Sequence, residues 1–418
     1  MVLASKRYKY KLLQNLQKHG INSAVCGLNT IAKQYNEFLR EKYKNKKIIA
    51  IYSDTEGRPH YKYLGSIREI LQKHGFTIVY ILSFENLDFE AIYKYHKDNS
   101  DEVIFANFEF LSQLDFFPFV ISFNNILNFH PSVTSLRIHS SLDEVQNYVW
   151  LNEVYNNRET EKANTISMFL NTYLNIHSKS HLKYLSINQS LQNADSNPRS
   201  RFILGGYPSI DKEAKDILGY KDTKRDTIIF VSALISIFRK ELSVEIIKFL
   251  LSLGYRVIFK SNPSHISHST HEDMVASYFL DNEKFVYQKA DKPKLSIEDK
   301  ERSITAIECA SSLMYSYPVT AKRPSILFYP PKNKIPSDLL ENDAFYNPNI
   351  HIRVFESEYK EVLGGILESL ANDEKIRKEW YEKIDNYCKN DLYNFGNASE
   401  EIAKWIIDWY NANSILDV

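Results

Sequence analysis

Short apolar runs alternate with helix-period stretches through the first half of the chain. A buried strand is predicted at 46–54, where KKIIAIYSD ends in polar turn residues, and a helix at 63–75, where YLGSIREILQKHG ends at a glycine. FTIVYIL at 76–82 is the next strand, and further strands are expected at 102–106 and 119–123. Because a strand, a helix and a strand at this spacing form a βαβ unit, the pattern predicts an open parallel sheet flanked by helices.

The same alternation returns after a polar stretch, LQNADSNPRS, at 191–200. Strands are predicted at 226–234, 255–261, 284–288, 303–312 and 324–330, a helix at 241–254, and further helices from about 357. The chain is therefore divided into a basic helical segment at 1–45, a Rossmann-like domain at 46–204, a second Rossmann-like domain at 205–390 and a C-terminal helix at 391–418.

Two Rossmann-like domains that face each other across a central cleft make up the GT-B architecture of nucleotide-sugar-dependent transferases. We predict this α/β fold, with a helical N-terminal segment, C-terminal helices and ligands at the carboxyl ends of the strands. The pattern alone also fits a periplasmic-type binding protein or an epimerase. The binding protein is disfavoured because the N-terminus lacks the apolar core of a signal peptide, and an NAD enzyme is disfavoured because no GxGxxG occurs.

Charge is balanced over the whole chain but unevenly distributed along it. The 418 residues hold 52 basic and 52 acidic side chains, which argues against a dedicated nucleic-acid binder. Residues 1–47 hold eleven Lys or Arg and only two Glu, a difference of +9. A basic segment beside aromatic residues suits an anionic membrane surface, and a solvated helical face is the alternative.

Cysteine content and hydropathy favour a cytoplasmic protein that associates peripherally with the inner face of the membrane at most. The three cysteines, Cys26, Cys309 and Cys388, are too few for a disulfide framework and form no CxxC pair of the kind that binds zinc. No apolar stretch of about 18 residues occurs, so no membrane span is expected.

The turn GGYPSID at 205–211 resembles one that precedes the second nucleotide-binding half in CDP-glycerol glycerophosphotransferases and their capsule-polymerising relatives. Segments 137–145, 303–331 and 391–406 are similar to that family in order and spacing. The resemblance implies a GT-B transferase with a cytidine-nucleotide donor. One position departs from it, because the family's His-Pro is Asn262-Pro263 here, and an amide can donate a hydrogen bond to phosphate but carries no charge.

Donor-binding residues are predicted mainly around the second set of strands. Ser311 and Ser312 stand between a strand and a helical run, where free backbone N–H groups and hydroxyls suit a phosphate, and an ordinary helix cap is the alternative. Gly206 and Tyr207 could equally form a tight connection between the halves. The full predicted set is Ser311, Ser312, Asn262, Lys260, Glu308, Gly206 and Tyr207.

The base that removes the acceptor's proton is predicted to be His139, because a neutral imidazole titrates near the working pH. His130 competes for this role, and so does Glu56, whose acidic–Gly loop resembles a motif of GT-B sialyltransferases. No metal is expected, since the His-rich stretch at 265–271 has loop-like neighbours and no nearby cysteine or acidic pair.

These residues together predict an inverting transferase that needs no metal or other cofactor. It would move a glycosyl or polyol-phosphate unit from a CDP- or CMP-linked donor to a hydroxyl of a bacterial surface glycan of the capsule, lipooligosaccharide or teichoic-acid type. Two alternatives stay open. One is a sialyltransferase-like or polysialyltransferase-like enzyme that uses a CMP-sugar, and the other is a non-catalytic glycan- or nucleotide-binding protein of the same fold, which the missing His-Pro suggests.

Overall fold

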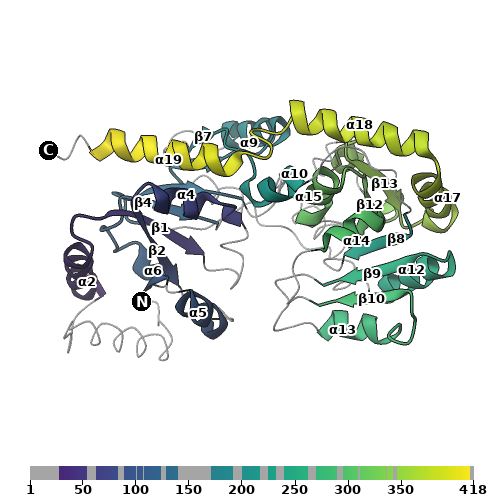
Figure 1. Cartoon of the computed structure of the whole chain (residues 1–418), viewed down its shortest axis with the longest axis horizontal. Helices are drawn as coiled ribbons and strands as arrows, with labels where there is room; N and C mark the ends of the chain where they lie inside the picture. Colours follow the sequence, from purple (N-terminus) through teal and green to yellow (C-terminus); the bar gives the residue numbers. More distant parts are fainter. Residues whose placement is uncertain are drawn as a thin grey trace.

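Two parallel sheets lie side by side in the molecule, as the alternation of strands and helices predicts (Figure 1). The computed structural model describes residues 28–53, 63–82, 89–99, 101–106, 108–123, 129–139, 171–191, 200–216, 225–231, 240–261, 270–289, 295–308, 311–335, 337–341 and 346–414. No helix among these residues is both long enough and apolar enough to cross a membrane.

In the described part of the chain the first sheet has seven strands, in the order β3-β2-β1-β4-β5-β6-β7. β1 and β2 are paired along their whole length, from Lys47 opposite Phe76 to Ser53 opposite Leu82. The strands are β1 (Lys47–Ser53), β2 (Phe76–Leu82), β3 (Glu102–Phe105), β4 (Phe119–Ser122), β5 (Thr134–Arg137), β6 (Tyr173–Asn175) and β7 (Arg201–Ile203).

Both faces of this sheet are buried, because helices cover each of them. Alternate residues of β1 divide between two apolar clusters. Ile48, Ala50 and Tyr52 pack toward α2 (Leu28–Lys42) and α6 (Phe108–Leu111). Ile49 and Ile51 pack toward α4 (Ile67–Lys73) on the other face. The remaining helices of this half are α5 (Phe89–Asp98) and α9 (Lys179–Leu191).

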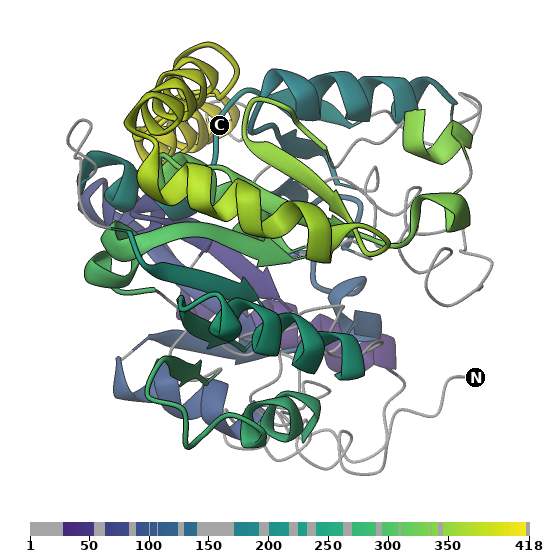
Figure 2. The same cartoon turned by 90° about the vertical axis from the view of Figure 1, so that its right-hand side faces the viewer.

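The second sheet has six strands among the described residues, in the order β10-β9-β8-β11-β12-β13 (Figure 2). They are β8 (Thr227–Val231), β9 (Arg256–Lys260), β10 (Phe285–Gln288), β11 (Ser303–Glu308), β12 (Ser325–Tyr329) and β13 (His351–Phe355). The helices of this half are α10 (Asp211–Asp216), α12 (Lys240–Ser252), α13 (Thr270–Ser277), α14 (Ile297–Arg302), α15 (Ser312–Ala321), α16 (Ser337–Glu341), α17 (Tyr359–Asn372) and α18 (Glu374–Asn390), with short 3-10 turns η1 (Pro208–Ile210) and η3 (Lys332–Lys334).

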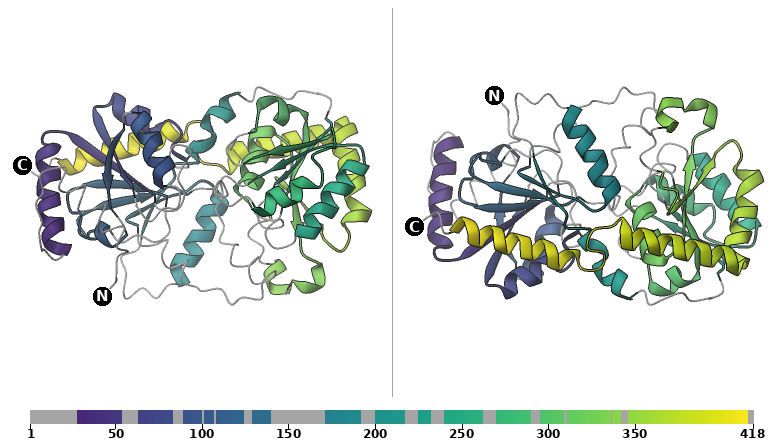
Figure 3. Two further views of the ribbon diagram at one scale, coloured as in Figure 1. Left: turned by 90° about the horizontal axis from the view of Figure 1, so that it is seen from below. Right: turned by 90° about the horizontal axis from the view of Figure 1, so that it is seen from above.

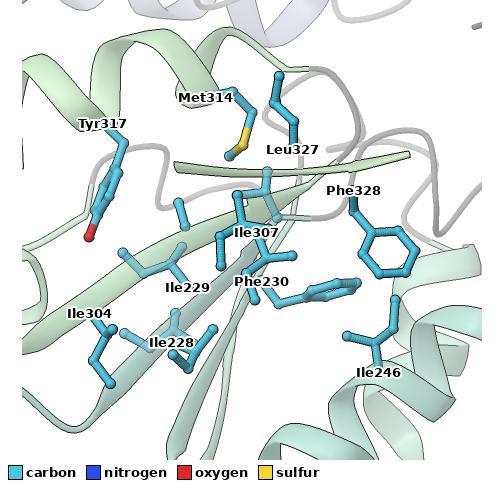
Figure 4. Packing of buried hydrophobic residues seen from close by; sticks show 14 of the residues in the cluster. Ile228, Ile229, Phe230, Ile246, Ile304, Ile307, Met314, Tyr317, Leu327 and Phe328 are labelled. Carbon is cyan, nitrogen blue, oxygen red and sulfur yellow. The ribbon is translucent and has the colours of Figure 1, made fainter. Parts of the chain in front are cut away.

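In the core of the second half, alternate side chains of a strand point to helices on opposite faces of the sheet. Leu327 of β12 points toward Met314 of α15, and its neighbour Phe328 points to the opposite face, toward Ile246 of α12 (Figure 4). Tyr359 of α17 also packs against Phe328, with ring centroids 5.5 Å apart. The sheet therefore has α15 on one face and α12 with α17 on the other.

Four short strands were not expected from the sequence, namely β5, β6, β7 and β13. Each has only three to five residues, and each of the sequences TSLR, YLN, RFI and HIRVF includes at least one polar or charged side chain. An apolar run of strand length is absent from all four, so periodicity gives no signal for them.

The last helix, α19 (Ala398–Ser414), returns from the second half to the first. Figure 3 shows α18 and α19 following one another along the molecule, α18 over the second sheet and α19 over the first. Trp409 packs on Phe119 of β4 with ring centroids 4.8 Å apart, and Trp405 packs on Tyr173 of β6 at 4.7 Å. The first core is therefore completed by the C-terminal end of the chain.

The chain passes between the halves at two segments, 204–207 and 391–397, which we call the joint. Asn394 donates its side-chain amide to the carbonyl oxygen of Leu204 at 2.8 Å, which ties one segment to the other. A Cβ on Gly206, which has φ +87°, would overlap the carbonyl oxygen of Tyr393. The two segments therefore touch, and only glycine fits at this point.

Asp211, the last residue of GGYPSID, fastens the joint to both halves. Its buried carboxylate accepts hydrogen bonds from the backbone N–H groups of Ala398 at 3.1 Å and Ser399 at 2.7 Å, at the start of α19. The Ser399 hydroxyl accepts in turn from the backbone N–H of Ser66, which caps α4, at 3.1 Å. Ser399 thus links two segments that are distant in sequence, the one around Asp211 and the one around Ser66.

Candidate functional site

The topology of the two sheets marks where a ligand would bind each of them. In both, the chain runs outward over three strands and then continues on the other side of the first, so its direction reverses between β1 and β4 and between β8 and β11. Ligands of open parallel sheets bind at the carboxyl ends of the strands beside such a reversal. The strands of both sheets end toward the neighbouring half (Figure 1).

The N-terminus of α15 lies at the reversal of the second sheet. β11 pairs with β8 and ends at Glu308, and α15 begins at Ser312, its first helical residue. Ser311 is the N-cap in extended conformation, yet its side chain makes no capping hydrogen bond. Among the described residues its buried Oγ has no partner. This helix start therefore combines a hydroxyl donor with first-turn N–H groups, a combination that suits an anion.

Two buried charges stand on either side of β8 at the same level. Lys260 ends β9 opposite Val231, and Glu308 ends β11 one residue after Ile307, which pairs with Phe230. Both are buried, at 4% and 0% exposure, and register places them roughly 10 Å apart between Cα atoms. Glu308 is opposite Leu327, which points toward α15 (Figure 4), so both charged side chains lie on the α15 face of the sheet.

Gly206 and Tyr207 belong to the joint between the two halves. The Gly206 N–H donates to the carbonyl oxygen of Ile176 at 3.0 Å, and its own carbonyl accepts from the Asn175 side chain at 2.7 Å. Tyr207 is buried with its ring 4.9 Å from that of His177. These contacts match the structural alternative for the two residues, a tight connection between the halves.

His139 follows β5 in the first half and is completely buried, at 0% exposure. Its ring meets those of His177 and His181, with centroids 5.6 and 4.6 Å away and both pairs nearly perpendicular. Burial, and secondly the Arg137 guanidinium, hold the pKa of His139 well below its ordinary value. The imidazole is therefore neutral at pH 7, as a general base requires, but in this conformation it is covered.

His130 is the other predicted catalytic residue that the structure describes, and it makes none of these ring contacts. His130 is partly exposed, and its Nδ1 bonds the hydroxyl of Ser132 at 2.8 Å. Glu56, predicted as a competing base, and Asn262, predicted to bind the donor, lie outside the described residues.

His177 and His181 were not singled out by the sequence, although they surround His139. Ser178 caps α9 by accepting the His181 N–H at 3.0 Å, so His181 is the third residue of a helix that is separated from the end of β6 by three residues. A serine cap beside two histidines four residues apart, in HSKSH, is the signal that was available. That signal does not by itself indicate a site, because the short strand β6 before it has no apolar run that would predict a strand.

No protein family is matched by the sequence, and no curated protein matches it either. Solved structures do resemble this chain. S. aureus MnaA, in a co-structure with UDP, has a TM-score of 0.55 at 12% identity, over 88% of this chain and 97% of that one. UDP-GlcNAc 2-epimerase from Neisseria meningitidis, bound to UDP-GlcNAc, has a TM-score of 0.52 at 11% identity, over 87% and 100%. The chain has the GT-B fold.

The predicted fold is thereby confirmed. The start of α15 follows β11 of the second sheet, whereas the histidine cluster follows β5 and β6 of the first, so the two lie in different halves. At identities of 10–12% these likenesses concern the fold alone, and the CDP-glycerol subtype stays a prediction.

Proposed function

We propose that the protein is a transferase that moves a glycosyl or polyol-phosphate unit from a cytidine-nucleotide donor to a hydroxyl of a bacterial surface glycan. The main support for a nucleotide donor is the start of α15, which lies at the reversal of the second sheet. There the Ser311 hydroxyl makes no hydrogen bond among the described residues and could donate to a phosphate. The cytidine base and the glycan acceptor rest on the sequence resemblance around 205–211 and 303–331.

The buried charges beside α15 support a ligand that is anionic at one end and hydroxylated at the other. Lys260 would add positive charge at the end of β9, and the Glu308 carboxylate at the end of β11 would accept hydrogen bonds from ligand hydroxyl groups. Phosphate donors fixed in advance would stabilise the negative charge that grows on the leaving nucleotide. The acceptor would bind at the first half, where His139 would remove its proton.

Replacing Ser311 and Ser312 together by alanine tests the donor site. Each lost hydrogen bond to a charged phosphate costs about 1.5–3 kcal/mol, so we expect CDP or CMP affinity in calorimetry to fall by at least tenfold. Ser296→Ala is the matched control, because Ser296 also caps a helix, α14, but there its hydroxyl accepts the Asp299 N–H at 3.0 Å. Equal nucleotide affinity in the double variant and the wild type would show that the serine pair only caps α15.

A second candidate, an epimerase of a UDP-sugar, is favoured by the likeness to structures determined with UDP and UDP-GlcNAc. The two activities differ in what they need. An epimerase converts UDP-GlcNAc with no acceptor present, whereas the proposed transferase releases nucleotide from a CDP- or CMP-linked donor only when a hydroxyl acceptor takes the unit. Proton NMR of both incubations separates them, and C2 inversion of UDP-GlcNAc would overturn the transferase.

A further inference from the structure

The histidine cluster touches the joint directly. The carbonyl oxygen of His177 accepts the backbone N–H of Tyr393, in the 391–397 segment, at 2.9 Å. Its ring lies 4.9 Å from that of Tyr207, in the 204–207 segment. His177 therefore contacts both segments through which the halves are connected, one by its backbone and one by its side chain.

The same residue also contacts the ring of His139. The two imidazoles meet at 90° with centroids 5.6 Å apart, and all the atoms involved belong to fully buried residues. Closely packed interiors have few alternative arrangements, so a displacement of one buried ring is passed to the rings against it. A path of direct contacts thus runs from Tyr207 through His177 to His139.

His181 is the third histidine of the cluster, and its hydrogen bonds fix both its position and its tautomer. Its Nδ1 accepts the backbone N–H of His177 at 3.2 Å, so that nitrogen carries no proton and the neutral ring carries its proton on Nε2. Its own backbone N–H is held by the Ser178 hydroxyl at 3.0 Å. The imidazole 4.6 Å from His139 is therefore locked in position and tautomer by the start of α9.

We propose that His177 is a positioning residue, which ties the His139 imidazole to the joint so that the placement of His139 follows the relative position of the two halves. The proposal rests on the proposed function in one respect, that His139 acts on the acceptor. GT-B halves that close on a donor would then adjust the base in the other half by the same movement. Part of the binding energy of the donor in the second half would then serve to orient His139 in the first half.

The contact path can be tested without any assay of activity. We would record the ring signals of His139 by NMR on the full-length protein with labelled histidine, at neutral pH. Tyr207→Leu keeps the apolar volume at the joint but removes the ring against His177, and we expect it to shift the His139 signals. In a His177→Ala background the same Tyr207→Leu change should leave them where His177→Ala alone puts them. This double-mutant comparison isolates the route through His177 from any direct effect.

Leu185→Ala is the control for cavity formation. Leu185 is fully buried in the same small cluster as Leu174 and Ile176, and its truncation removes none of the ring contacts. We expect it to leave the His139 signals in place. If Tyr207→Leu does not move His139, or moves it equally with and without His177, the proposal is overturned.

Kinetics then separates this proposal from the proposed function. For an active transferase, His177→Ala should lower kcat by about 10- to 100-fold with the nucleotide Kd unchanged, whereas Leu185→Ala should lower neither. Ring signals that follow the joint in a protein without any transferase activity would support the contact path and refute the proposed function. An unchanged kcat in an active His177→Ala variant would overturn the positioning role.

Discussion

At the scale of single residues, the buried histidines make stability depend on pH. Burial holds the pKa of His139 well below the ordinary value of 6.5, and burial also lowers the pKa of His96. The unfolded chain therefore binds these protons at a pH where the folded chain does not. The contribution of each group is fully present above about pH 6.5 and is lost as the pH falls below it.

We therefore expect the free energy of unfolding to fall below pH 6.5 by up to about 1.4 kcal/mol per pH unit for His139. Urea titrations at a series of pH values measure this slope. His139→Gln should flatten it, and His130→Gln, at a partly exposed position, is the control that should not. A slope that is the same in all three proteins would mean that His139 is protonated in the folded state.

The same residue bears on catalysis. If His139 is the base, His139→Ala should lower turnover by about 10²–10⁴-fold, while donor affinity stays constant because the nucleotide is held by the other half. The acid limb of the wild-type pH–rate profile should lie below pH 6.5, since burial lowers the pKa. His130→Ala is the chemically matched control. Full turnover in His139→Ala would remove this residue from the mechanism.

At the scale of elements, strands with long apolar runs were predictable and short mixed strands were not. KIIAIYS and FTIVYIL are buried on both faces, so nearly every position must be apolar and the run itself is the signal. In β6, YLN, the two buried residues are Leu174, which packs in a small apolar cluster, and Asn175, whose side-chain amide donates to the carbonyl of Gly206. Such a strand is defined by its neighbours in space, and so is the histidine cluster that follows it.

Helix α2 shows that the charge of a segment does not predict which of its residues are buried or paired. The sequence groups residues 1–45 as one basic segment, yet Leu39 and Tyr35 are buried against the first sheet. Arg40 and Lys42 pair with Asp115 and Glu102, each at 2.7 Å. The membrane hypothesis therefore now applies to residues 1–27, which hold five Lys or Arg and no acid and lie outside the described residues.

Two variants distinguish a structural role of α2 from a membrane role of residues 1–27. Leu39→Ala should cost about 2–5 kcal/mol of stability, because it leaves a cavity in the first core. A chain that begins at residue 28 should keep its fold and lose affinity for anionic liposomes, most clearly at low salt, where charges are least screened. Co-sedimentation with vesicles and urea unfolding measure the two effects. Equal vesicle binding with and without residues 1–27 would refute a role for them at the membrane.

At the scale of the whole molecule, the two-half architecture was readable from the sequence, but the joint was not. Two repeats of strand and helix spacing are local features, and they predict two sheets. Contact between 204–207 and 391–397 depends on residues about 190 positions apart, so no local pattern encodes it. GGYPSID stands out in the sequence as a motif, and the structure shows Gly206 packed against the 391–397 segment and Asp211 hydrogen-bonded to the start of α19.

Gly206→Ala should show that the joint couples the unfolding of the two halves. Gly75 is the matched control, because its φ of +83° is similar to the +87° of Gly206, but a Cβ there meets nothing within 4 Å. Gly75→Ala should cost only the strain of a left-handed alanine, about 1–2 kcal/mol. At Gly206 the same strain is joined by overlap with the Tyr393 carbonyl and the Ala398 side chain, which adds about 1–3 kcal/mol and pushes the two segments of the joint apart.

Calorimetry should therefore show one transition for wild type and Gly75→Ala, and a broadened or split transition for Gly206→Ala, as halves that no longer touch unfold separately. If both variants lose the same stability in a single transition, the segments of the joint can move apart without cost, and they do not hold the halves in place.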